Sequence, residues 1–215
     1  SEMCIRDSPR LIDVYFLPNE PEMGSEALRL LSERPGLVDE ATRTKWLDTY
    51  CAQCRDGGEP AGSVIDLLSA IDREAFNLDL QSRGHDAIAA GRPHDVIAML
   101  QPLVRSRLAT EETRIQLALA NLAAAGDERH AGNAYFKRAV NLISPLARTF
   151  GYDVATRLAS SPITAADRLA LAIDLEQRGP ADIDLARKLL GQFDPSDLEG
   201  DDERKLAALT ARLGA

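Results

Sequence analysis

Apolar residues along most of the chain recur every three or four positions, the spacing that places them on one face of an α-helix. Glycine, proline and polar residues separate these segments and predict turns between them. Three predicted bends, at Gly57, Gly91 and Gly126, follow one another at intervals of 34 and 35 residues. The next steps of this size reach Ser161–Pro162 and Ser196. A constant interval in this range predicts a protein built from repeats.

The boundaries between the bends keep the same interval. Thr110, Pro145 and Pro180 each precede or open a predicted helix, and they are 35 residues apart. The bends and the boundaries alternate along the chain with the same period, which predicts two helices per unit. The clearest unit is the hairpin Arg114–Ile143. Pairing across Gly179–Pro180 is the alternative, but it leaves the predicted helix before Ser160 without a partner.

The predicted helices alternate as the two arms of hairpins. Pro102 lies inside one of them, where the missing N–H costs about 3 kcal/mol, so we expect that helix to kink or end early. Ser144–Pro145 is expected to begin the fourth unit. The main apolar stripes are Trp46, Leu47, Tyr50, Cys51 and Cys54; Val64, Leu67, Leu68 and Ile71; Val96, Ile97, Leu100, Leu103 and Val104; Ile115, Ala118, Leu119 and Leu122; and Leu206, Leu209 and Leu213.

The first residues divide differently. Residues 1–8 resemble translated sequencing-adapter read-through from a bacterial metagenome, and we leave them out of the fold. Residues 9–35 fit a partial first repeat, although Leu11–Leu17 would also suit a strand. Residues 36–215 form the predicted repeat domain, which ends in a capping helix near Asp202–Leu213.

Composition supports an all-α fold and limits the partners. The 215 residues are 45% hydrophobic but only 5% aromatic, which suits closely packed helices. A net charge of −9 opposes binding to the nucleic-acid backbone. No apolar run approaches the roughly 18 residues that a membrane span needs, so we expect none.

The repeats resemble the tetratricopeptide family, whose unit is two antiparallel helices. The matching positions are Gly84 and Gly91 around a turn; Gly62, Ala131 and Ala166 after the turns; Leu100 and Tyr135 as large apolar residues; and Pro145 and Pro180 near unit ends. The departures are Tyr50, Leu119 and Val154 at small-residue positions, Ser161 and Ser196 at turn glycines, and Asp66 and Ala170 at large apolar positions. Residues 151–159 and 186–190 also resemble the related Sel-like repeats. The resemblance implies a right-handed α-solenoid of about five helix-turn-helix units.

Reactive side chains form few patterns. Cys51 and Cys54 have a CxxC spacing, but they lie at the end of an amphipathic helix and have no second ligand pair, so we interpret them as core residues. A redox or metal site at this pair is the alternative. His85, His94 and His130 are scattered along the chain. We therefore expect no catalytic residues, metal or cofactor.

The family resemblance implies a concave surface lined by the first helix of each unit, which binds a peptide or a partner domain. Its polar candidates are Thr44, Gln81, His85, Thr113, Gln116 and Arg148. The leading hypothesis is a non-catalytic scaffold for protein interactions. The alternative, which rests on the Sel-like resemblance, is a periplasmic structural component of a bacterial polysaccharide-export assembly, with any leader sequence missing from this fragment.

Overall fold

The structure, a computed structural model, describes residue 33 and residues 38–56, 62–130, 132–150, 153–161, 163–192 and 194–214. Every regular element in these ranges is a helix and none is a strand, so the all-α prediction is confirmed. The predicted adapter-like segment 1–8, the bend at Gly57 and, apart from Glu33, the partial first repeat 9–35 lie outside these ranges. The chain divides into two compact units, Ser1–Thr113 and Arg114–Ala215.

The first unit contains α3 (Glu40–Arg55), α4 (Gly62–Ala89), α5 (Pro93–Arg105) and the start of α6 (Glu111–Ala125). Asp39 caps α3 by accepting a hydrogen bond from the Thr42 N–H at 2.8 Å. The long α4 is two helices joined at Asp72, whose φ of −161° and ψ of 95° are not helical. Asp72 accepts a bond from the Ala75 N–H at 2.9 Å and so starts the second helix.

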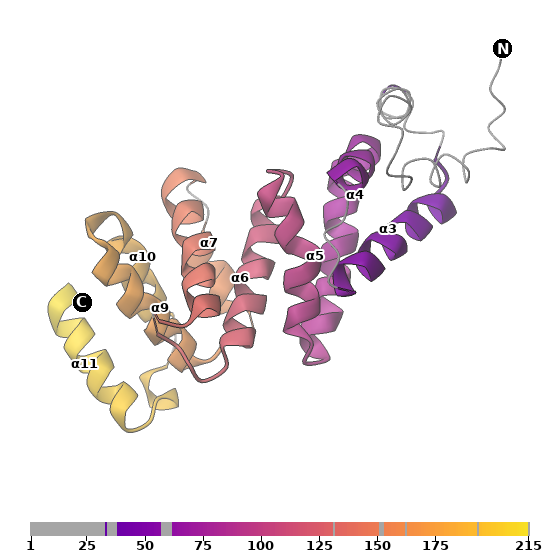
Figure 1. Ribbon diagram of the computed structural model, residues 1–215. Coiled ribbons are helices and arrows are strands. Elements are labelled where there is room, and N and C mark those ends of the chain that lie inside the picture. The colour runs from indigo at the N-terminus through magenta and orange to yellow at the C-terminus, as the bar shows by residue number, and fades with distance from the viewer. Residues whose placement is uncertain are drawn as a thin grey trace, which may run out of the picture. The chain divides into compact units, whose positions relative to one another are not determined.

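Figure 1 shows α4 and α5 side by side, joined by a tight turn. Gly91 in this turn has a φ of +70°, a left-handed conformation that favours glycine. The helix α5 continues through Pro102 and ends three residues later at Arg105, so the proline neither stops nor kinks it as the sequence interpretation expected. Tyr50 of α3 packs edge-on against Phe76 of α4, with ring centroids 5.6 Å apart, so all three helices share one core.

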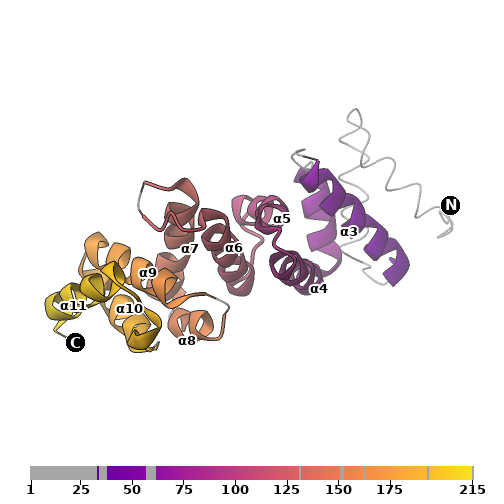
Figure 2. The ribbon, with the colours of Figure 1, turned by 90° about the horizontal axis from the view of Figure 1, so that it is seen from below.

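The second unit contains most of α6, then α7 (Ala134–Phe150), α8 (Val154–Ala159), α9 (Ala165–Arg178), α10 (Pro180–Leu190) and α11 (Asp201–Leu213). A short 3-10 turn, Pro195–Asp197, precedes α11. Turns occur where the sequence predicted them, at Gly126 with φ +57° and at Gly179 with φ +124°. The helix α9 packs most extensively against α10, and Figure 2 shows the two side by side. These two helices therefore pair across Gly179–Pro180, which is the alternative that the sequence interpretation set aside.

Pro145 does not start a helix, so this part of the sequence interpretation is wrong. It lies inside α7, which runs unbroken from Ala134 to Phe150. Ile143 and Leu146, on either side of the proline, are 0% and 1% exposed. Burying such side chains contributes about 1.5–3 kcal/mol each, which offsets the roughly 3 kcal/mol cost of an interior proline. The next helix is the short α8, which Asp153 caps through the Thr156 N–H.

One continuous apolar core joins the helices of the second unit, from Ile115 on α6 to Leu213 on α11. The last helix attaches through buried Leu209 and Leu213 and through polar contacts at its C-terminal end. There the guanidinium of Arg187 donates two hydrogen bonds to the Leu213 carbonyl, at 2.9 and 3.2 Å. The predicted C-terminal helix is therefore present and covers one edge of this core.

Candidate functional site

The six predicted binding residues have different surroundings. In the first unit, Thr44 on α3 and His85 on α4 are exposed, whereas Gln81 is partly buried and Thr113 is completely buried. Gln81 and Thr113 are in contact, because the Gln81 amide donates to the Thr113 hydroxyl at 3.1 Å. Of these four residues, Thr44 and His85 are the most accessible to a partner, and Thr113 is inaccessible.

Asn77 is the buried hydrogen-bond partner of Thr113. Its side chain is 1% exposed and accepts hydrogen bonds from the Thr113 hydroxyl at 2.7 Å and from the Thr110 N–H at 3.3 Å. Its amide donates to the carbonyls of Arg73 and Leu108. Asn77 therefore links α4 to the connection before α6 and to the first turn of α6. Sequence reasoning missed this residue, because a single asparagine in a helix carries no signal of its partners.

Gln116 and Arg148 lie in the second unit. Gln116 is partly buried on α6. Arg148, in the last turn of α7, extends toward Asp182 of α10, with Nε 3.4 Å from a carboxylate oxygen. The same oxygen accepts a bond from the Ser144 hydroxyl at 2.9 Å, and Asp182 is only 3% exposed. Arg148 thus has a structural role in addition to any role at the surface.

Cys51 and Cys54 are buried, free thiols on α3, at 3% and 4% exposure. Burial raises the pKa of Cys51, and it raises the pKa of the Cys54 thiol to about 11, so both are protonated at neutral pH. Burial likewise raises the pKa of Tyr50, whose hydroxyl donates to the Met99 carbonyl at 2.6 Å. These properties are those of core side chains rather than of reactive thiolates.

The described residues contain no group of three or more histidine, cysteine or acidic side chains placed to hold a metal ion. None of the helices in the described ranges has the length and apolar character that crossing a membrane requires.

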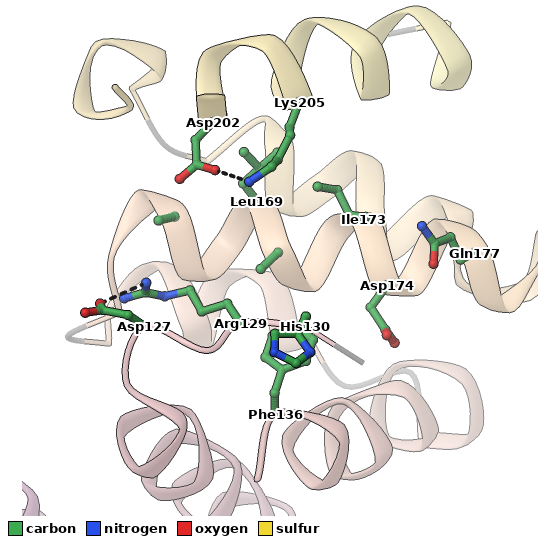
Figure 3. A pocket seen from close by; sticks show the side chains of 12 residues that line it. Asp127, Arg129, His130, Phe136, Leu169, Ile173, Asp174, Gln177, Asp202 and Lys205 are labelled. Carbon is green, nitrogen blue, oxygen red and sulfur yellow. Dashed lines mark hydrogen bonds and ion pairs between the residues drawn. The ribbon is translucent and has the colours of Figure 1, made fainter. Parts of the chain in front are cut away.

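A cleft of about 490 Å³ lies in the second unit (Figure 3). Its floor is one face of α9, where Ala166, Leu169, Ala170, Ile173 and Gln177 recur at helical spacing. One wall is the connection between α6 and α7 with the start of α7, and the other is the first turn of α11. None of the six predicted binding residues lines this cleft.

The charged groups of the cleft are paired with one another. On one wall, Arg129 binds Asp167 and is 3.3 Å from Asp127. Burial alone would lower the pKa of Arg129, but the hydrogen bond and charge of Asp167 raise it above its ordinary value. On the other wall, Lys205 binds Asp202 at 2.7 Å, and hydrogen bonds to acidic neighbours raise the pKa of Lys205.

Local sequence fixes the cleft wall at His130. The Gly132 N–H donates to Nδ1 of His130 at 3.1 Å, so the neutral ring carries its proton on Nε2. Asn133 then starts α7 by accepting bonds from the N–H groups of Tyr135 and Phe136. Figure 3 shows the His130 ring beside Phe136 at the cleft.

Comparisons with protein-family models, with curated proteins and with solved structures found no match.

Proposed function

We propose that this protein is a non-catalytic scaffold for protein interactions, built as a stack of helical hairpins similar to tetratricopeptide repeats. The observation that supports the stack most strongly is the sequence separation of residues that meet between helices. In a stack of equal units, a side chain meets its counterpart one unit further along the chain. Many polar contacts between helices should then join residues about one repeat apart.

Such contacts recur in both units at separations close to the 35-residue interval. In the first unit, the Arg73 guanidinium donates to the Leu108 carbonyl 35 residues away, and Asn77 meets Thr113 at 36 residues. In the second unit, Arg178 donates to Asn141 at 37 residues, and Arg212 donates to Glu176 at 36 residues. Two further pairs in the second unit, Arg129 with Asp167 and Ser144 with Asp182, are both 38 residues apart.

A stack of hairpins buries its core between neighbouring units and leaves long faces open for a partner. Two accessible positions of the predicted binding face, Thr44 and His85, are exposed on α3 and α4. Neither is required for the core, so both suit variants that test binding without disturbing the fold. Arg148 suits such a test less well, because a charge reversal there places a second carboxylate beside buried Asp182.

The test uses the full chain, immobilised, as bait for a phage-displayed random peptide library. The enriched peptides are then synthesised and their affinities are measured by calorimetry. We expect micromolar binders, and we expect Thr44→Ala with His85→Ala to weaken those that use the predicted face. Asp86→Ala, at the next position of α4, is the matched control. Enrichment no greater than on an unrelated helical protein would refute the scaffold proposal.

A further inference from the structure

The cleft of the second unit has a shape that suits a chain segment. Its floor follows α9 from Ala166 to Gln177, and the eleven steps between these residues rise about 16 Å along the helix. A segment of about five extended residues has the same length. Small side chains at Ala166 and Ala170 let a bound side chain approach α9 closely, between the flanking residues Leu169 and Ile173.

The charges around this floor favour an uncharged occupant. Each charged side chain that lines the cleft has an opposite charge as its neighbour, with Arg129 between Asp127 and Asp167, and Lys205 beside Asp202. Asp174 at the far end binds Arg178 at 2.6 Å. A charged ligand would have to compete with these existing pairs, whereas an apolar side chain leaves them intact.

Two neutral polar groups remain for the ligand. Both side chains are exposed, and among the described residues no protein group bonds to the Nε2–H of His130 or to the Gln177 amide. His130 therefore offers a donor, and Gln177 offers both a donor and an acceptor. A peptide unit carries the matching groups, a C=O acceptor and an N–H donor, and an extended segment leaves both free. An acyl chain would satisfy neither.

We propose that this cleft binds an uncharged, extended peptide segment of a partner protein. One apolar side chain of the segment lies over Ala166 and Ala170, and its backbone hydrogen-bonds to His130 and Gln177. The site lies outside the six positions that the family resemblance implied, on the surface formed by α9, α11 and the connection before α7 (Figure 3). The inference rests on the proposed scaffold function, and it names the chemistry of the partner.

The experiment measures how the enriched peptides bind to four full-length variants. Ala170→Trp fills the floor and should abolish binding. His130→Ala and Gln177→Ala each remove one hydrogen bond to the peptide and should weaken binding by about 2- to 10-fold. The unfolding temperature should stay unchanged in Gln177→Ala, whereas His130→Ala also removes the acceptor of the Gly132 N–H, so Gln177→Ala is the decisive variant of the two. His94→Ala, an exposed histidine elsewhere, is the control and should bind normally.

A chemical change in the peptide distinguishes the loss of a hydrogen bond to the peptide backbone from a change that the substitution causes in the folded protein. N-methylation of the peptide N–H that donates to the Gln177 side-chain oxygen should weaken binding to the natural protein. The same methylation should cause no further loss of affinity in the Gln177→Ala variant. Consensus sequences rich in acidic or basic residues would overturn the proposal, as would peptides that bind Ala170→Trp normally. If the peptides bind but their affinity depends on Thr44 and His85, the proposed site in the cleft is wrong and the proposed scaffold function still holds. A library without binders would refute both.

Discussion

Replacement of Asn77 by leucine tests the polar link that fixes Thr113 and the start of α6. Leucine keeps the size of the side chain and removes its four hydrogen bonds, which are made to Arg73, Leu108, Thr110 and Thr113. The Asn77 side chain is 1% exposed, so water cannot replace it without a rearrangement. We expect a lower free energy of unfolding with the fold retained.

The size of the expected loss depends on which other hydrogen bonds each former partner of Asn77 retains. The Leu108 carbonyl still accepts from Arg73, and the Thr113 hydroxyl still contacts Thr110, at 2.9 Å. The Thr110 N–H loses its acceptor, and an unmade bond of this kind costs about 1–3 kcal/mol. The other lost bonds contribute about 0.5–1.5 kcal/mol each but are partly replaced. The expected loss is about 2–4 kcal/mol.

Urea unfolding followed by circular dichroism measures this loss from the shift of the midpoint at unchanged slope. Asn141→Leu is the matched control, because Asn141 is exposed on α7 and accepts a bond from Arg178 at 2.9 Å. Its loss should stay within about 0.5 kcal/mol. Equal losses for the two variants, or a loss below about 1 kcal/mol for Asn77→Leu, would show that the buried network does not stabilise the fold as described.

Three further predictions concern other parts of the chain. Arg107 has a φ of +61°, so Arg107→Gly should raise the unfolding temperature through relief of left-handed strain of about 1–2 kcal/mol, less the backbone entropy of glycine; a lower temperature would contradict this. Because the pKa of Cys54 is raised to about 11, the contribution of this thiol to stability should be constant below about pH 8.5 and fall above it, by up to about 1.4 kcal/mol per pH unit while only the unfolded thiol ionises. The decline in alkali should be shallower in Cys54→Ala, and an identical pH profile would refute the assignment. Thr164→Ala removes the capping box of α9 and should cost about 1 kcal/mol in urea unfolding, whereas no change would mean that the cap contributes nothing.

Much of the helix pattern follows from local chemistry in the sequence. Gly91, Gly126 and Gly179 predicted the turns correctly, because each adopts a positive φ that other residues disfavour. Pro145 misled because the cost of an interior proline is local, whereas the apolar face of α7 continues past it on both sides. The cap at Asp153 was the better indication of a new helix.

The candidate site was less predictable than the helices. The family resemblance implies Gln81 and Thr113 as surface positions, but a position within a repeat cannot tell a surface side chain from one that, like Thr113, meets Asn77 in the interior. The cleft brings together three segments that are each unremarkable in sequence. His130 gains its place only because Gly132 orients its ring, a contact that requires the folded connection.

The central claim is that helices meet their counterparts about one repeat further along the chain. Pairs of cysteines in the second unit test it directly, in a background where the three native cysteines are replaced by alanine. The pairs at positions 141 and 178 and at positions 176 and 212 replace contacting residues one period apart. The control pair, at positions 141 and 212, combines the first position of one pair with the last position of the other and spans two periods.

Each pair is treated with a short bismaleimide in the folded protein, and crosslinked peptides are quantified by mass spectrometry. The proposed stack predicts efficient crosslinking of both one-period pairs and none of the two-period pair, because one repeat separates its members. A closed bundle brings all three pairs to similar distances. Crosslinking of positions 141 and 212 as efficient as that of positions 141 and 178 would contradict the repeat architecture on which the proposed function depends.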